Sequence, residues 1–302
     1  MTNIGAEFFM KLYHYTTSNV LMKILSLKEI WFTDFRFLND MQEFYFAKEI
    51  AKNTLNEFNF GNPIDEFKSK FGHGGKNLGS FEKLIDNFKE RFVPGVFGRF
   101  QNDYVPYVFS LSADGDSLSQ WRAYGNGELC IEFDSDKLLQ ATSGRLHKIE
   151  YRSRGDSDEG LSFSIDKFFL EVFEQFKNYG RIDIETIEDG WQDVRPNFLR
   201  NSSPIGIKHK GFKDECEWRI VKEYSLRGKG HPETFFDGAR YPTPRAKVRL
   251  CDDVENLSKI ITGVRFGPGS DVTLAKNSIA VLNLAMGTKY EVQFSDIPYR
   301  PK

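Results

Sequence analysis

The sequence predicts an α+β fold, with one domain over residues 1–302 whose mixed or antiparallel β core carries helical insertions. Segments with helical and with strand periodicity interleave, but without the regular βαβ spacing of about 30 residues that builds a doubly wound sheet. No internal repeat of roughly 20 to 50 residues is present, which argues against a solenoid. Phenylalanine is common, at 29 of 302 residues, and indicates a globular protein with an aromatic core.

Two strands and a connecting helix are expected at the start of the chain. Residues 12–15 (LYHY) and 29–33 (EIWFT) have the aromatic and β-branched composition of strands. Ser18 is placed to cap the helix between them. The apolar residues of that helix recur on one face: Val20, Leu21, Ile24 and Leu25.

Helices are expected to dominate the next part of the chain. Asn39 and Asp40 are placed to cap a helix over residues 41–53. Residues 54–103 hold further helical pieces around a glycine-rich stretch, and we expect a mainly helical insertion there. A later amphipathic helix carries a stripe that should be core: Ile165, Phe168, Phe169, Val172, Phe173 and Phe176.

The remaining strands are expected in the second and last thirds of the chain. Residues 121–128 (WRAYGNGE) should form a helical turn and loop between the first two of them. A helix after the GPGS stretch carries Leu274, Ala275, Ile279 and Leu282. The expected strands are residues 104–111, 129–133, 217–223, 246–251, 258–264 and 290–294.

Composition excludes several classes of protein. Lys and Arg total 41 against 43 Asp and Glu, so no global basic field attracts nucleic acid or a membrane surface. The three cysteines, Cys130, Cys216 and Cys251, are far apart and form no CxxC pair, which suggests neither a disulfide framework nor a zinc site and fits a cytoplasmic protein. The sequence shows no signal peptide and no apolar run of about 18 residues, so we expect no membrane contact.

Several common catalytic motifs are absent from the sequence. It contains no GxxxxGK[ST] loop and no GxGxxG after a strand, which disfavours two frequent nucleotide-binding folds. HExxH is absent and the five histidines never pair at helical spacing, so no metal site is expected. The lack of GxSxG disfavours a serine hydrolase.

The first candidate site is the run from Tyr13 to Thr17 (YHYTT). A neutral imidazole at His14 can donate from one nitrogen and accept at the other, which suits a ribose hydroxyl. The flanking Tyr13 offers an aromatic face for a base or a nicotinamide ring. The alternative is a histidine hydrogen-bonded inside an aromatic core.

The second candidate site combines a hydroxyl pair with an aromatic pair. Ser110 and Ser112 fall on one side of a strand, and Trp121 and Tyr124 fall on one face of a helical turn. Together they could form a pocket for a flat polar ligand. Serines at a strand end and a Trp/Tyr pair closing a core are an equally ordinary explanation.

The third candidate site is the acidic pair Glu215 and Glu217 beside Trp218. In an extended chain the two glutamates face the same way, so one could hold a sugar hydroxyl while the other accepts a proton. The alternative is a charged, solvated strand edge.

These pieces, taken in order, resemble the family of prokaryotic proteins called DUF2971. The similar motifs are LYHYTT, FTDFRFLNDMQEF, FSLS with SLSQWRAYG, GELCIEF, KDECEWRIV and KIITGVRFGPG. The resemblance covers nearly the whole chain outside residues 54–103 and parts of 152–207. The chain departs from the pattern at WRAYGNGE, where relatives often carry W-x-x-Y-x-x-x-H-x-G.

A second similarity is to ADP-ribosyltransferases, particularly the DarT-like branch, and it implies a split β-sheet with NAD as substrate. Carried over by motif, it assigns His14 and Thr16 to the ribose and the nicotinamide amide, and Glu217 to the nicotinamide ribose. It also assigns Glu215 to the acceptor. Further residues expected at the NAD pocket are Tyr13, Arg36 near the phosphates, Ser110, Ser112, Trp121 and Tyr124.

The resemblance implies an NAD-consuming enzyme, either an ADP-ribosyltransferase or an NAD glycohydrolase, with a protein or nucleic-acid acceptor. A toxin or antiphage effector held by an antitoxin or partner protein would fit this activity. One alternative is a non-catalytic defence or regulatory module that binds a nucleotide or a partner protein. A metal-dependent nuclease is the third reading.

Overall fold

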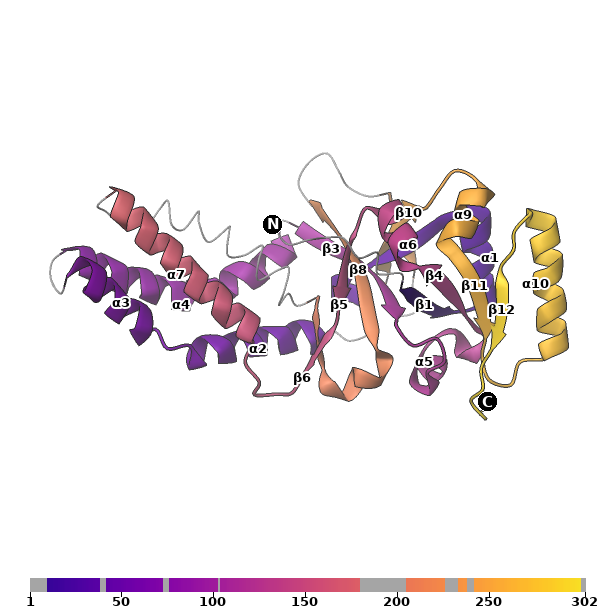
Figure 1. Cartoon of the computed structure of the whole chain (residues 1–302), viewed down its shortest axis with the longest axis horizontal. Coiled ribbons are helices and arrows are strands. Elements are labelled where there is room, and N and C mark those ends of the chain that lie inside the picture. Colours follow the sequence, from indigo (N-terminus) through magenta and orange to yellow (C-terminus); the bar gives the residue numbers. More distant parts are fainter. Residues whose placement is uncertain are drawn as a thin grey trace. The chain divides into compact units, whose positions relative to one another are not determined.

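The computed structural model describes residues 10–38, 42–72, 76–102, 104–179, 205–225, 233–237 and 242–299. Within them the chain mixes helices and strands, so the predicted α+β class is confirmed (Figure 1). Contacts divide the chain into two compact units, which we call the sheet unit (Met1–Leu38, Val105–Ile149 and Gly211–Lys302) and the helical unit (Asn39–Tyr104 and Glu150–Lys210). The single domain over 1–302 stays a prediction.

The sheet unit is built around a ten-stranded mixed sheet with the order β12-β11-β4-β1-β3-β2-β10-β9, in which β8 pairs with β3 and with β5. β11 and β12 run parallel, whereas β1 is antiparallel to both β3 and β4. The strands are β1 (Lys11–Thr16), β2 (Glu29–Asp34), β3 (Tyr104–Ser112), β4 (Leu129–Asp134), β5 (Arg145–Lys148), β8 (Glu217–Ser225), β9 (Thr234–Asp237), β10 (Thr243–Arg249), β11 (Ile261–Phe266) and β12 (Glu291–Phe294).

The two faces of this sheet have different cores. On one face Leu12, Phe109 and Ile131 join a large aliphatic core. Helices α1 (Ser18–Leu27), α6 (Ser135–Thr142) and α9 (Val254–Ile260) contribute their apolar residues to that core. Because side chains alternate along a strand, the intervening residues point to the other face, where Tyr15 packs with Trp121 and Cys130 in a smaller core. We call these the main-core face and the small-core face.

Two expected boundaries in the sheet unit are wrong. The cap of α1 is Thr17, whose hydroxyl accepts a hydrogen bond from the amide of Val20, and Ser18 is already helical. Residues 258–260, expected to begin a strand, belong to α9, which Asp253 caps. β11 therefore begins only at Ile261. In both cases a capping side chain one or more residues upstream begins the helix. The other helices here are α5 (Leu118–Ala123) and α10 (Val272–Met286).

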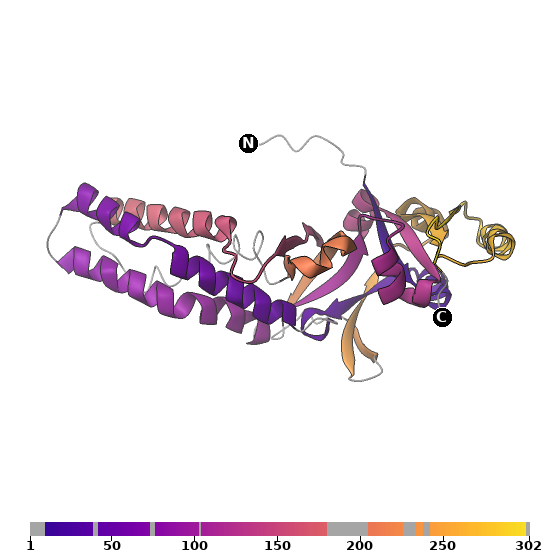
Figure 2. The same ribbon diagram turned by 90° about the horizontal axis from the view of Figure 1, so that it is seen from below.

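The helical unit contains four helices that run alongside one another, α2 (Gln42–Glu57), α3 (Gly61–Phe71), α4 (Lys76–Asn102) and α7 (Glu159–Tyr179) (Figures 1 and 2). β6 (Glu150–Arg152) and β7 (Ile207–His209) form a separate parallel pair. The expected stripe on α7 is buried, and stacked rings such as Phe67 and Phe81, with centroids 4.6 Å apart, make this core aromatic. The expected caps Asn39 and Asp40 lie outside the described residues.

No helix in the described part of the chain combines the length and the apolar character that crossing a membrane requires.

Candidate functional site

The candidate site in the sheet unit lies where β3 changes its partner. Ser112, at the end of β3, pairs with Tyr13 of β1. Nearer its start, β3 pairs with β2 instead, through Val108 and Tyr107. The main-chain segment between these pairing points includes Ser110, and the side chain of His14 reaches it.

His14 is fixed at this point by one hydrogen bond and one ring contact. Its Nδ1 atom lies 3.0 Å from the carbonyl oxygen of Ser110, and its ring stacks on Phe109 with centroids 4.5 Å apart. Burial lowers the pKa of His14, the bond to Ser110 acts in the opposite direction, and the positive charge of Arg245 lowers the pKa further. A neutral ring with its proton on Nδ1 leaves Nε2 as a hydrogen-bond acceptor. No described residue forms a hydrogen bond with Nε2.

Strand alternation separates His14 from Glu217. His14 shares its face of β1 with Leu12, on the main-core face, and stacks on Phe109 there. On β8, Trp218 and Ile220 pack on that same core, so Glu217 points to the small-core face. The strands β1, β3 and β8 do lie in one sheet. The side chains of His14 and Glu217 nevertheless point to different faces of it, so the expectation that both line one NAD pocket is wrong.

The hydroxyl of Ser112 is already used within the protein. It donates to the main-chain oxygen of Glu215 at 2.7 Å and accepts the amide of Asp114 at 3.1 Å. These two bonds tie the end of β3 to the segment that leads into β8. Ser112 thus holds two main-chain segments together, whereas Ser110 meets His14 through its carbonyl.

The expected aromatic pair, Trp121 and Tyr124, belongs to the small core instead of lining a pocket. Trp121 is 1% exposed, packs edge-on against Tyr15 and donates its indole N–H to Asp116 at 2.8 Å. Tyr124 and Tyr13 pack against the same cluster. Because Trp121 has no open face, it does not line a pocket for a flat polar ligand as expected.

The small core also holds the loop after β3 in place. The hydroxyl of Tyr15 donates to the carbonyl of Asp114 at 2.8 Å and accepts the amide of Ser117 at 2.9 Å. Gly115 lies against the ring of Tyr13, where an added Cβ would come within 2.6 Å of a ring carbon. The aromatic residues around His14 therefore have a structural role in this loop.

The acidic pair is divided by a backbone turn. Cys216 has φ 45°, in the left-handed region, and Glu215 ends the 3₁₀ helix η3 (Lys210–Glu215), whereas Glu217 begins β8. The expectation that both glutamates face the same way assumed an extended chain and is wrong. A non-glycine residue in this conformation is strained, which is a frequent feature of functional sites.

Glu217 forms a buried ion pair with Arg219. The two Arg219 nitrogens Nε and Nη2 lie 2.7 and 3.0 Å from the two carboxylate oxygens, and the residues are 7% and 1% exposed. Two parallel charge-assisted hydrogen bonds of this kind fix both side chains. Glu217 therefore presents a negative charge that Arg219 already balances.

Arg36, expected near the phosphates of NAD, is likewise paired. Its Nε and Nη2 atoms donate to the fully buried carboxylate of Asp34 at 3.1 and 2.7 Å. The hydrogen bond with Asp34 raises the pKa of Arg36. Arg36 remains partly exposed, but the fork formed by its Nε and Nη2 groups serves Asp34.

Sequence reasoning missed Glu132, a buried carboxylate on the strand beside β1. It is 2% exposed on β4 and accepts from Lys11 at 2.8 Å and from Thr262 at 2.7 Å. Burial alone would raise the pKa of Glu132, but these donors outweigh it and the pKa is lowered. Burial and the nearby Glu132 raise the pKa of Tyr13 to about 12. The signal in the sequence was a glutamate inside the apolar strand LCIEF.

The described residues contain no cluster of three or more His, Cys, Asp and Glu side chains that could hold a metal ion. The third reading, a metal-dependent nuclease, gains no support from the described part of the chain.

Comparison with known proteins gives one match. Residues 120–220 match the family described as "Protein of unknown function (DUF2971)". No curated protein and no solved structure matches the chain. The matched segment runs from the small core around Trp121 to β8 with Glu217 and Arg219. The match supports the resemblance to DUF2971 that the motifs indicated, over residues 120–220.

Proposed function

We propose that the protein is an NAD-consuming, ADP-ribosyltransferase-like enzyme that transfers ADP-ribose or hydrolyses the nicotinamide–ribose bond. The observation that carries this proposal is the placement of His14 at the point where β3 leaves β1 for β2. A split of this kind is the sheet architecture expected for such enzymes. A neutral histidine there, with Nε2 directed away from its bond to Ser110, can accept a hydrogen bond from a ribose hydroxyl.

The chemistry requires a negative charge near the sugar. Cleavage of the nicotinamide–ribose bond passes through an oxocarbenium-like ribose, and a fixed carboxylate stabilises the positive charge that develops. Glu217 is the carboxylate proposed for this step, since β8 lies beside β3. Arg219 fixes the orientation of the Glu217 carboxylate through two hydrogen bonds. Because His14 and Glu217 point to different faces, the role of Glu217 is proposed separately from the ribose contact of His14.

One observation favours a second function. Glu217, Arg36 and Ser112 all have their charge or hydroxyl satisfied by the protein itself. A network that is complete without ligand suits a non-catalytic module that binds a nucleotide or a partner protein. In that case NAD would bind without being consumed, or would not bind.

The two functions are separated by incubating the purified protein with NAD and measuring the release of nicotinamide. The enzyme should release nicotinamide, and its melting temperature should rise with NAD concentration, because binding to the folded state adds RT ln(1 + [L]/Kd) to the stability. A melting shift without release would support the module. The absence of both release and a shift at millimolar NAD would contradict the enzyme and would favour a module that does not bind NAD.

The proposal extends to the cellular role of this activity. We expect the protein to act in the cytoplasm on a protein or nucleic-acid acceptor, as a toxin or antiphage effector held by an antitoxin or partner. Growth arrest on expression of the wild type, relieved by substitution of His14, would support this setting. Normal growth at full expression would contradict a toxin that is active on its own.

A further inference from the structure

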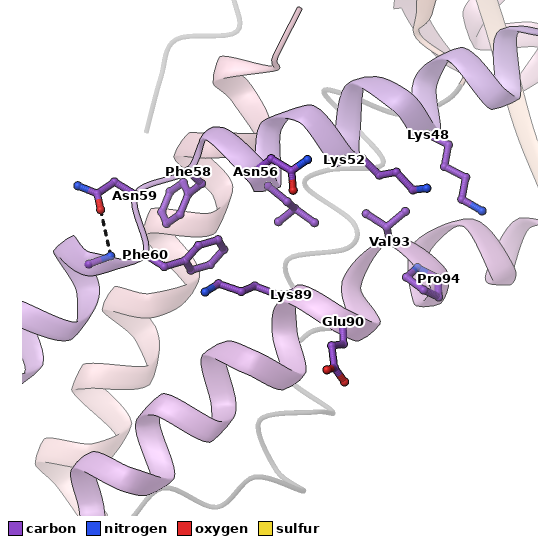
Figure 3. A pocket seen from close by; sticks show the side chains of 12 residues that line it. Lys48, Lys52, Asn56, Phe58, Asn59, Phe60, Lys89, Glu90, Val93 and Pro94 are labelled. Carbon is purple, nitrogen blue, oxygen red and sulfur yellow. Dashed lines mark hydrogen bonds between the residues drawn. The ribbon is translucent and has the colours of Figure 1, made fainter. Parts of the chain in front are cut away.

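A pocket of about 810 Å³ opens in the helical unit, outside every candidate site described above (Figure 3). It is lined by the second half of α2, by the turn that leads into α3 and by the middle of α4. Its volume lies within the range of roughly 300–1,000 Å³ that small-molecule sites occupy. All of its lining residues belong to the helical unit.

Lysines dominate the charge of this pocket. Lys48 and Lys52 are one turn apart on α2, and Lys89 reaches from α4 over the ring of Phe60, with its Nζ 4.6 Å from the ring centroid (Figure 3). None of these three lysines forms an ion pair with a described residue. The lining has one acidic residue, Glu90, whose carboxylate points away from Lys48 and Lys52 in Figure 3.

The unpaired lysines contrast with others in the same unit. Lys70 and Lys167 each have a glutamate one helical turn away, at 2.7 and 3.8 Å. Lys48 and Lys52 instead place two positive charges at i and i+4, an arrangement that destabilises a helix. An anion bound between them would remove this repulsion. The pocket therefore carries an unbalanced positive charge that favours an anionic ligand.

The other end of the pocket suits an aromatic ring. Phe58 lines the pocket, is half-buried and meets Phe60 edge-on with centroids 4.7 Å apart. Asn56 lines the same end and forms no hydrogen bond with a described residue. Asn59 differs, because its amide is used by Gly61 and Asn62. An aromatic face beside a free amide can stack on a base and bond to its edge.

Pro94 leaves a main-chain carbonyl of α4 without its usual helical partner. A proline inside a helix has no N–H, so the carbonyl of the residue four positions earlier loses its helical partner. That residue is Glu90, and both line the pocket. The carbonyl of Glu90 can accept a hydrogen bond from a ligand hydroxyl.

From these features we propose that the pocket binds a nucleoside phosphate. The phosphates lie at Lys48 and Lys52, and the base lies against Phe58 with the amide of Asn56 at its edge. Along α2 the distance from Lys48 to Asn56 is about 12 Å at 1.5 Å per residue, which suits a ligand with a phosphate chain at one end and a base at the other. This inference does not depend on NAD turnover in the sheet unit.

The test titrates the full chain with ATP, tripolyphosphate and adenosine by isothermal calorimetry. ATP should bind more tightly than either fragment, and added salt should weaken the binding. The double variant Lys48→Glu/Lys52→Glu should lose about tenfold or more in ATP affinity, because two attractive charges become repulsive. Phe58→Ala should weaken ATP but leave tripolyphosphate unchanged.

The matched control is Lys83→Glu, an exposed lysine on α4 outside the pocket, which should bind ATP as the wild type does. Thermal melts check the fold of each variant, and Lys48→Gln/Lys52→Gln replaces the charge reversal if that variant is unstable. Equal ATP affinity in the pocket variants and in Lys83→Glu would overturn the proposal. So would the absence of ATP binding at millimolar concentration, or tripolyphosphate binding as tightly as ATP.

Discussion

The Nδ1 atom of His14 lies 3.0 Å from the carbonyl oxygen of Ser110, at the place where β3 passes from β1 to β2. This bond gives the two nitrogens of the ring different tasks. Nδ1 forms a hydrogen bond with a main-chain carbonyl, whereas Nε2 is an acceptor that the described protein does not use. A structural role of His14 depends on Nδ1, and a ligand role depends on Nε2.

Two substitutions of His14 distinguish these roles. His14→Asn keeps an N–H donor near the position of Nδ1 and removes the acceptor, so the fold should change in stability by less than about 1 kcal/mol. Under the proposed function its NAD turnover should fall by roughly 10²-fold or more. The measurement is nicotinamide release together with thermal melting. Full turnover in His14→Asn would show that Nε2 does not contact NAD.

The reciprocal substitution is His14→Gln, whose longer amide reaches the position of Nε2 and leaves the Ser110 carbonyl without its donor. It should lose about 1–3 kcal/mol of stability, the cost of an unsatisfied buried polar group. It should also keep more of the turnover than His14→Asn does.

The stability of the protein should depend on pH through His14. Its folded pKa is lower than the ordinary value of 6.5, so the unfolded chain binds the proton more readily. The contribution of a neutral His14 is therefore complete above pH 6.5 and is lost as the pH falls below that value toward the folded pKa. Urea unfolding at several pH values should show this loss in the wild type and a weaker dependence in His14→Asn. Parallel pH curves for the two proteins would contradict it.

Glu217→Gln should destabilise the protein, contrary to what the sequence suggested for a charged strand edge. The change removes the negative charge that faces Arg219, which is 1% exposed, and breaking a buried ion pair costs about 3–5 kcal/mol. The double variant Glu217→Gln/Arg219→Gln removes both charges and should recover much of that stability. Denaturant unfolding of both variants measures the difference.

The same double variant tests the catalytic role of Glu217. If the carboxylate stabilises the developing charge on ribose, a folded Glu217→Gln/Arg219→Gln protein should release no nicotinamide. If this variant releases nicotinamide at the wild-type rate, the Glu217–Arg219 pair has a structural role only.

Glu132→Gln should lower stability at neutral pH by about 1–3 kcal/mol, because Lys11 and Thr262 lose a charged acceptor. The folded pKa of Glu132 is below its ordinary value of 4.5, so its contribution is present above pH 4.5 and is lost as the pH falls through the folded pKa. Urea unfolding at several pH values should show an additional loss of stability below pH 4.5 in the wild type, and Glu132→Gln should lack this component.

The matched control for Glu132 is Glu255→Gln, which breaks an exposed ion pair with Lys259 on α9. It should change stability by no more than about 0.5 kcal/mol. Equal effects of the two substitutions would mean that the enclosure of Glu132 contributes nothing.

The sequence by itself determined several of the elements and the side of each of these that is apolar. The stripe from Ile165 to Phe176 is buried on α7, and the expected strands at residues 12–15, 29–33 and 129–133 lie within β1, β2 and β4. These results follow from local periodicity, because apolar residues that recur every 3.6 or 2 positions form one face of a helix or strand, and that face must pack against another part of the protein. The prediction holds whichever element packs there.

Only the tertiary structure decided what the polar residues do. That His14 and Glu217 point to different faces depends on the register of three strands and on the left-handed turn at Cys216. The burial of Glu132 depends on Lys11 and Thr262, which come from distant parts of the chain. A strand pattern shows that alternate residues differ in environment, but a polar side chain gains its partners from long-range pairing, and one sequence window holds no information on which strand lies beside it.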